Sequence, residues 1–160
     1  MEVNPVPRAA YLHIPFCEHI CHYCDFNKYF MDGQPVNDYL VALRKEIQET
    51  MKRFPSAAIE TIYVGGGTPT ALDHRQTACF MESIQESLNP KADEIEFTVE
   101  ANPGNLDRKK LMILKEAGVN RLSIGVQSFD DQLLKEIGRT HTADEVYKTI
   151  EEAESVGFDN

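Results

Sequence analysis

Short apolar runs alternate along this chain with longer segments whose apolar residues recur every three or four positions. The short runs predict strands over residues 9–14, 59–64, 95–100 and 121–126. The longer segments predict helices over residues 37–53, 74–88, 107–117, 130–137 and 143–157. Thr142 and Glu145 have the spacing of a capping box and so predict where the last helix begins.

Strand and helix therefore alternate four times, and no two strands are joined by a hairpin turn. This order calls for parallel strands with right-handed helical crossovers, so the predicted fold class is α/β, either a barrel or an open sheet. No linker or low-complexity run divides the chain, so residues 1–160 are predicted to form one domain. Because residues 158–160 look like the start of another strand, we expect the architecture to continue beyond them.

The composition narrows the class of protein. Hydrophobic residues make up 42% of the 160 positions and charged residues 26%, which is ordinary for a globular protein. A formal net charge of −10 argues against non-specific nucleic-acid binding, because that depends on lysine and arginine neutralising phosphates. No apolar run approaches the roughly 20 residues that span a bilayer, and residues 1–8 lack a signal-peptide pattern. We therefore expect a cytoplasmic protein with reduced thiols.

Three of the four cysteines follow the first predicted strand. Cys17, Cys21 and Cys24 have the spacing C-x3-C-x2-C, so one loop presents three thiols to a common point. Thiolates gathered in this way bind soft metal centres, and iron–sulfur clusters are held by such cysteines. The fourth, Cys79, lies beside Phe80 in a predicted helix and is interpreted as a core residue. A four-iron cluster would then keep one iron without a protein ligand.

From the residues alone, two alternatives to a cluster stay open. A zinc ion could bind the three thiolates and one histidine, although structural zinc sites usually pair their cysteines as C-x2-C twice. The candidate histidines are His13, His19 and His22. A disulfide would leave the third cysteine without a partner and is rare in the cytosol. The spacing favours the cluster.

Polar and glycine-rich features follow the other predicted strands. A glycine run at residues 65–67 follows the second strand, Glu100 ends the third, and Gln127 follows the fourth. Each has a plain structural interpretation: a strand–helix turn, a solvated carboxylate and a loop cap. The carboxyl ends of parallel strands share one face, however, and active sites form there. Their convergence therefore predicts a binding site.

The string Tyr-Leu-His-Ile-Pro-Phe-Cys at residues 11–17, with Cys-x-Tyr-Cys-Asp-Phe at residues 21–26, resembles the signature of the radical S-adenosylmethionine (SAM) superfamily. Within it, the sequence looks like the branch of oxygen-independent coproporphyrinogen III oxidases and HemW-type heme chaperones. The resemblance implies a parallel (β/α) partial barrel of radical SAM type, with its N-terminal four β/α units present. It also implies a [4Fe–4S] cluster on Cys17, Cys21 and Cys24, with SAM chelating the fourth iron.

The same resemblance implies a set of SAM-binding residues, carried over position by position. They are Tyr11, Tyr23, Gly66, Gly67, Thr68, Glu100, Gln127 and Arg139. In the family, the glycine–threonine segment binds the methionine end of SAM. The residue matching Glu100 accepts hydrogen bonds from the ribose, and the one matching Arg139 contacts a carboxylate. The oxidase branch holds two SAM molecules, with Tyr11, Gly66 and Glu100 matching one site and the others matching the second.

The resemblance implies two possible functions for such a protein. For neither function do we assign a catalytic residue within this chain. One is a HemW-like heme chaperone, which binds heme, transfers it to acceptor proteins and uses an electron donor. The other is the oxidase, which decarboxylates coproporphyrinogen III with SAM in heme biosynthesis. The oxidase signature has one more cysteine, and here Phe26 stands in its place. A phenyl ring has no proton to donate and no lone pair, so Phe26 favours the chaperone. We expect SAM cleavage, heme or a porphyrinogen as ligand, and no nucleic-acid partner.

Overall fold

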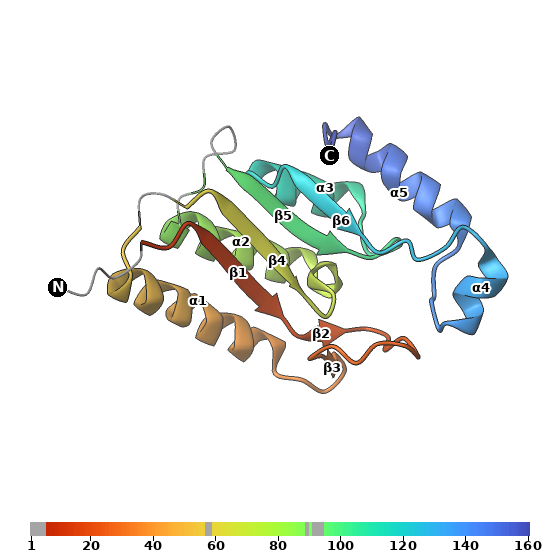
Figure 1. Cartoon of the computed structure of the whole chain (residues 1–160), viewed down its shortest axis with the longest axis horizontal. Helices are drawn as coiled ribbons and strands as arrows, with labels where there is room; N and C mark the ends of the chain where they lie inside the picture. Colours follow the sequence, from red (N-terminus) through yellow and green to blue (C-terminus); the bar gives the residue numbers. More distant parts are fainter. Residues whose placement is uncertain (1–5, 57–58, 89, 91–94) are drawn as a thin grey trace.

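The computed structural model describes residues 6–56, 59–88, 90 and 95–160. Residues 1–5, part of the segment in which no signal peptide is predicted, lie outside the described residues. Four strands form a parallel sheet in the order β1-β4-β5-β6 (Figure 1). They are β1 (Ala9–Ile14), β4 (Thr61–Gly66), β5 (Glu96–Ala101) and β6 (Arg121–Ile124). The predicted α/β class and the parallel strand order are confirmed.

A helix makes each crossover between neighbouring strands. These helices are α1 (Val36–Arg53), α2 (His74–Leu88), preceded by the short 3-10 turn η1 (Pro69–Ala71), and α3 (Arg108–Glu116). α1 packs against α2 and α2 against α3, so the three helices cover one face of the sheet in a row (Figure 1). None of the helices described is both long and apolar enough to cross a bilayer.

Side-chain caps begin the last three helices. Asp107 accepts a hydrogen bond from the Lys110 N–H at the start of α3. Asp130 accepts hydrogen bonds from the Gln132 and Leu133 N–H groups at the start of α4 (Asp131–Glu136). Thr142 and Glu145 form the predicted capping box of α5 (Ala143–Ser155), each side chain bonding to the backbone of the other. These caps satisfy backbone N–H groups that have no partner inside the helix.

Three of the four strands differ from their predicted ranges, β5 by only one residue at each end. β4 begins at Thr61 and runs through Gly66, two residues later than predicted at both ends. β6 ends at Ile124, because the Val126 N–H turns back to the Ile124 carbonyl at 2.9 Å. The chain has therefore left the sheet before it reaches Gln127.

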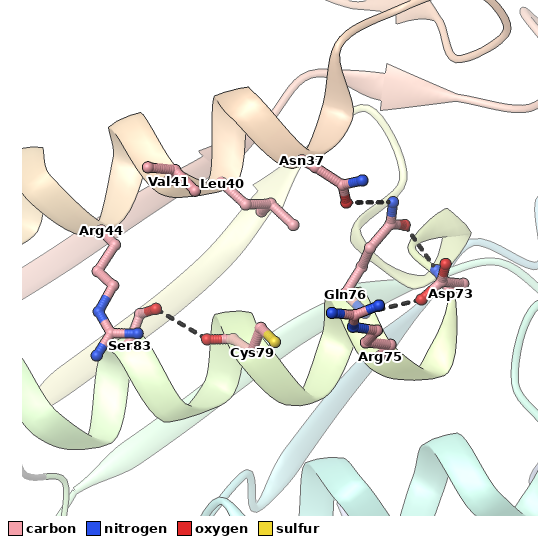
Figure 2. A pocket seen from close by; sticks show the side chains of 9 residues that line it. All are labelled: Asn37, Leu40, Val41, Arg44, Asp73, Arg75, Gln76, Cys79 and Ser83. Carbon is pink, nitrogen blue, oxygen red and sulfur yellow. Dashed lines mark hydrogen bonds between the residues drawn. The ribbon is translucent and has the colours of Figure 1, made fainter.

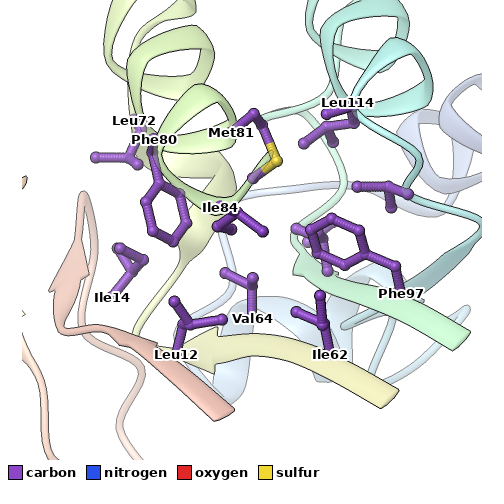
Figure 3. Packing of buried hydrophobic residues seen from close by; sticks show 14 of the residues in the cluster. Leu12, Ile14, Ile62, Val64, Leu72, Phe80, Met81, Ile84, Phe97 and Leu114 are labelled. Atoms are coloured by element: carbon purple, nitrogen blue, oxygen red, sulfur yellow. The ribbon is translucent and has the colours of Figure 1, made fainter. Parts of the chain in front are cut away.

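The core lies between the sheet and the helices. Apolar side chains of β1, β4 and β5 point towards α2 and α3 and interdigitate with theirs (Figure 3). Its most deeply buried members include Ile14, Ile62, Val64, Ile84, Phe97, Val99, Leu111 and Leu114. Burial of this apolar area is the main stabilising term of the fold.

Cys79 does not belong to this core, so its interpretation as a core residue is wrong. Its side chain is exposed, whereas Phe80 and Ile84 on the same helix are buried. Successive residues of a helix are rotated by about 100°, so a direct neighbour of a buried residue can face solvent. The rotation of the helix therefore turns Cys79 towards solvent, although its neighbours Phe80 and Met81 are apolar and buried.

A second, two-stranded sheet was not predicted. β2 (Phe16–Cys17) pairs in parallel with β3 (Tyr29–Phe30). The Tyr29 N–H bonds to the Pro15 carbonyl at 2.6 Å, and the Met31 N–H to the Cys17 carbonyl at 2.8 Å. This pair clamps both ends of the segment 18–28, which carries Cys21 and Cys24.

Candidate functional site

The cysteine loop lies at the carboxyl end of β1, where β2 begins. Cys17 is buried, Cys21 and Cys24 are half-buried, and all three are free thiols. Burial raises the pKa of Cys17, a hydrogen bond from Thr68 lowers it, and the nearby Cys24 and Cys21 thiols raise it. The three thiols are thus electrostatic neighbours. Within the part of the chain described, no three Cys, His, Asp or Glu side chains are placed to hold a single metal ion.

His22 fastens the cysteine loop to the end of α4. Its backbone N–H bonds to the Ile137 carbonyl at 3.2 Å, and its Nδ1 lies 3.2 Å from the Glu136 carbonyl. Because a carbonyl only accepts, Nδ1 carries the hydrogen. The ring packs on Gly138, where an added Cβ would come within 3.0 Å of it. His22 is therefore a structural anchor of the loop.

His13 is also held by the protein itself. Its Nε2 lies 2.9 Å from the Asn27 carbonyl and must donate to it, so in the neutral ring Nδ1 accepts from the Tyr11 hydroxyl at 2.9 Å. Both ring nitrogens therefore have partners. This arrangement agrees with a structural role for His13 rather than a ligand role.

The glycine run after β4 passes unusually close to the cysteine strand. A Cβ on Gly67 would lie 2.7 Å from the Phe16 carbonyl oxygen and 2.9 Å from the Cys17 sulfur. Gly66 has φ 122°, and a Cβ there would lie 2.7 Å from the His13 ring. Only glycine allows both the close approach and this backbone conformation. The run is thus more than a plain strand–helix turn.

Glu100, at the end of β5, is half-buried and not simply solvated. Its Oε1 accepts from the Tyr63 hydroxyl at 2.7 Å, and its Oε2 from the Gly66 N–H at 3.1 Å. The Tyr63 ring stacks on Tyr11 with the ring centroids 6.1 Å apart. The carboxylate is therefore oriented by two neighbouring donors, and Tyr11 joins the same group.

Arg139 connects the far side of the site to the cysteine loop. Its Nη2 donates to the Tyr23 hydroxyl at 2.7 Å, and its Nη1 to Asn102 Oδ1 at 2.8 Å. Burial raises the pKa of Tyr23, whereas the charge and hydrogen bond of Arg139 lower it. Gln127 has φ 64°, and no other non-glycine residue in the described ranges has a positive φ. Such strained backbone is frequent at functional sites.

These elements surround a cavity of about 360 Å³ at the carboxyl edge of the sheet. Its lining residues are Gly67, Thr68, Glu100, Ala101, Asn102, Ser123, Ile124, Gly125, Gln127 and Arg139. Five of the eight predicted SAM residues thus line one cavity, and Tyr11, Tyr23 and Gly66 adjoin it through the contacts above. Its volume is within the range of small-ligand pockets.

Sequence reasoning missed several members of this lining, among them Asn102, Ser123 and Gly125. A Cβ on Gly125 would lie 3.0 Å from Asn102 Oδ1 and 3.3 Å from Arg139 Nη2, which explains the glycine. The signal that could have found them is their position, because each lies at or next to a strand's carboxyl end.

A larger hollow of about 430 Å³ lies between α1 and α2, away from these residues (Figure 2). Cys79 lines it together with Asn37, Gln76 and Arg44, and Arg44 forms an ion pair with Glu86. It contains none of the predicted site residues.

The residues at the carboxyl edge fit the cluster and SAM that the resemblance implies. Cys21 and Cys24 lie near enough to Cys17 to act on its pKa, so the three thiols are neighbours in one loop. In a cluster each cysteine binds its own iron, whereas the ligands of a zinc ion all lie about 2.0–2.3 Å from that one ion. Beside them, Gly67 leaves a cradle that a Cβ would fill. The adjoining cavity offers both a carboxylate and a guanidinium, which suits a ligand with hydroxyl and carboxylate groups.

Comparisons with known proteins agree with this fit. The Radical SAM superfamily model matches residues 11–160. The chain is 54% identical over 153 residues to "Heme chaperone HemW" of Bacillus subtilis (strain 168), covering 96% of this chain and 40% of that protein. It is 36% identical over 153 residues to "Heme chaperone HemW" of Escherichia coli (strain K12), covering 95% of this chain and 40% of that protein.

A solved structure is also similar. Coproporphyrinogen III oxidase (HemN) from Escherichia coli, described as a radical SAM enzyme, superposes with a TM-score of 0.85 at 32% identity, covering 94% of this chain and 35% of that one. The chain spans about 40% of the length of the curated relatives above.

Proposed function

Because this chain belongs to the radical SAM superfamily, we propose that it is the cluster-bearing part of a HemW-type heme chaperone. The resemblance predicted from the cysteine motif is confirmed, both to the superfamily and to its HemW and HemN branch. Membership implies a [4Fe–4S] cluster and SAM as cofactors. The activity of the whole protein and its further ligands are part of the proposal.

The proposed cluster ligands are Cys17, Cys21 and Cys24. When bound, the cluster supplies one electron to SAM. The chain's own residues hold and shape its surroundings: β2 and β3 clamp the loop ends, and His22 anchors the loop to α4. The buried position of Cys17 limits the access of water to that side of the loop.

The proposed SAM residues are those of the sequence prediction, and the cavity supports them. Glu100 is oriented by Tyr63 and Gly66, so its carboxylate can accept hydrogen bonds from ribose hydroxyls. Arg139 presents a guanidinium, which pairs with carboxylates through parallel N–H groups. Tyr11 and Tyr23 flank the cysteine loop, and the glycine run allows close approach to the backbone.

Phe26 is the observation that carries the chaperone assignment over the oxidase. Its ring lies beside His13, with the centroids 5.9 Å apart, and is 54% exposed at the rim of the cysteine loop. A fourth thiol of the oxidase kind is therefore replaced by a group that cannot transfer a proton. The 54% identity to the Bacillus subtilis chaperone supports the same choice.

The alternative function is oxygen-independent coproporphyrinogen III oxidase, and one observation favours it. The fold superposes on that of the Escherichia coli oxidase with a TM-score of 0.85. A shared fold hosts different functions, however, so this likeness does not separate the two branches.

The remaining parts of the proposal concern organisation and partners. Residues 1–160 form one domain, the N-terminal β/α units of a partial barrel, in a protein that acts in the cytoplasm. Its ligands are SAM and heme, and its protein partners are a heme acceptor and an electron donor. The net charge of −10 supports the absence of a nucleic-acid partner.

The test uses the full-length protein with its cluster rebuilt under anaerobic conditions. Heme is added and its binding followed by absorbance; separately, coproporphyrinogen III is supplied with SAM and a reductant. One heme bound per chain with no decarboxylation supports the chaperone. Catalytic formation of protoporphyrinogen IX would contradict it and establish the oxidase.

A further inference from the structure

A continuous line of hydrogen bonds leads from Arg139 to the sulfur of Cys17. Arg139 Nη1 donates to Asn102 Oδ1 at 2.8 Å, and Asn102 Nδ2 lies 3.2 Å from Thr68 Oγ1. Thr68 Oγ1 in turn lies 3.6 Å from Cys17 Sγ, a normal contact for the larger sulfur atom. Thr68 is only 5% exposed, so its hydroxyl has little access to water.

The chemistry of the two ends fixes the direction of every bond in this line. A guanidinium only donates, so it takes the amide oxygen of Asn102 and leaves the amide nitrogen to donate to Thr68. When Cys17 binds iron it is a thiolate, which only accepts, so the hydroxyl hydrogen of Thr68 would point at the sulfur. No other assignment satisfies all four groups at once.

We propose that Asn102 is a positioning residue that holds the Thr68 hydroxyl on Cys17 and thereby raises the reduction potential of the cluster. This inference rests on the proposed cluster ligation by Cys17. A hydrogen bond to a cluster sulfur withdraws negative charge and stabilises the more negative reduced state. Reduction of the bound cluster would take up one electron from the electron donor that the proposed function already names, and no proton.

Arg139 also contacts a second side chain next to the proposed cluster ligands. Arg139 donates to the Tyr23 hydroxyl at 2.7 Å, and Cys21 lies near enough to raise the pKa of Tyr23. The same guanidinium therefore contacts a side chain beside Cys21 as well as the line that leads to Cys17. Because Asn102 also lines the cavity beside Glu100, occupancy of the cavity and the potential of the cluster depend on the same side chain.

The experiment measures the midpoint potential of the full-length, cluster-loaded protein by titration monitored with electron paramagnetic resonance. Thr68→Val removes the hydroxyl at nearly constant shape, and Asn102→Asp keeps the contact with Arg139 but removes the donor to Thr68. Thr68→Ser restores the hydroxyl. Thr149→Val is the control, because Thr149 is equally buried but donates to the Glu145 carbonyl on α5.

We expect Thr68→Val and Asn102→Asp to lower the reduction equilibrium constant three- to tenfold, which for one electron is a shift of up to about 59 mV towards negative potential. Thr68→Ser and Thr149→Val should match the parent protein. Resonance Raman bands of the iron–cysteine bonds should change in the first two variants only.

Two outcomes would overturn the inference: an unchanged potential in both variants with the cluster intact, or an equal shift in Thr149→Val. Should Thr68→Val lose its cluster, the uncharged Asn102→Leu decides the matter through the same expected shift, because it removes the donor to Thr68 at similar size without adding the negative charge of Asn102→Asp. Absence of a cluster in the parent protein would instead refute the proposed function.

Discussion

The helix-covered face of the sheet and its carboxyl edge are held by different forces. Along the helix-covered face, β4 and β5 contribute Val64 and Phe97, which are buried among apolar neighbours without any directional bond. At the carboxyl edge, hydrogen bonds of defined direction fix Gly66 of β4, Glu100 of β5 and Asn102, which directly follows β5. Apolar packing tolerates changes of shape, whereas a hydrogen-bonded network fails when one atom changes. Stability and ligand binding should therefore be separable by mutation.

The largest effect should come from the edge. Replacing Cys17, Cys21 or Cys24 by Ala should abolish cluster binding, because a thiolate ligand is lost and no fourth cysteine is near the loop. The measurement is the iron content and visible absorbance after anaerobic reconstitution. Cys79→Ala is the matched control and should load normally. A fully loaded triple variant would disprove the assigned ligands.

A substitution in the apolar core should instead reduce stability. Phe97 is fully buried, so Phe97→Ala should lower the free energy of unfolding by about 3–5 kcal/mol. Urea unfolding followed by circular dichroism measures this. Val41→Ala, at a position 71% exposed, should change it by less than about 0.5 kcal/mol. If Phe97→Ala instead kept its stability and lost SAM affinity, the separation of the two regions would not hold.

A single charge at the edge should affect binding more than folding. Glu100→Gln removes the charge but not the size of the side chain, and hydrogen bonds to charged groups contribute about 1.5–3 kcal/mol. We expect the Kd for SAM to rise about 10- to 100-fold, measured by calorimetry on the cluster-loaded protein. Glu96→Gln, at the start of the same strand, is the control. Equal affinities in both variants would exclude Glu100 from the SAM site.

The smallest effect concerns a helix cap outside both regions. Asp107 caps α3 and pairs with His74 of α2 at 2.8 Å, so Asp107→Ala should cost about 1 kcal/mol of stability. Burial raises the pKa of Asp107, but the Lys110 N–H and His74 outweigh it, and the net pKa lies below the ordinary 3.8. The stabilisation is therefore complete above pH 3.8 and is lost as pH falls through the lowered pKa.

The measurement is the difference in unfolding free energy between wild type and Asp107→Ala across pH. That difference should shrink in acid. Asp32→Ala, at an exposed loop position, should show no such pH dependence. A difference that stays constant down to pH 2 would exclude the paired carboxylate as its cause.

Much of this arrangement could be predicted from sequence because it depends on local regularities. The helical period placed α2 at its observed bounds, and the spacing of Cys17, Cys21 and Cys24 identified the loop. The glycine run at residues 65–67 marked the end of its strand as part of the predicted binding site. These signals lie within a few positions of one another.

The rest depends on contacts between distant segments. Asn102 joins the site through hydrogen bonds to Arg139 and Thr68, which are distant from it in sequence. The β2–β3 pair has two-residue strands, too short for any period to show. The exposure of Cys79 was missed because its apolar neighbours suggested a core position, whereas the phase of the helix sets it outward.

The contact between Tyr23 and Arg139 has a consequence for synthesis on the ribosome. The two residues are 116 positions apart. At about 5–20 residues per second, Arg139 is made about 6–23 s after Tyr23. During that interval the nascent chain displays its three cysteines without the guanidinium, the Asn102 amide or the α4 end to which His22 binds. A cluster inserted at that stage would meet an unanchored loop, so loading should follow completion of the chain.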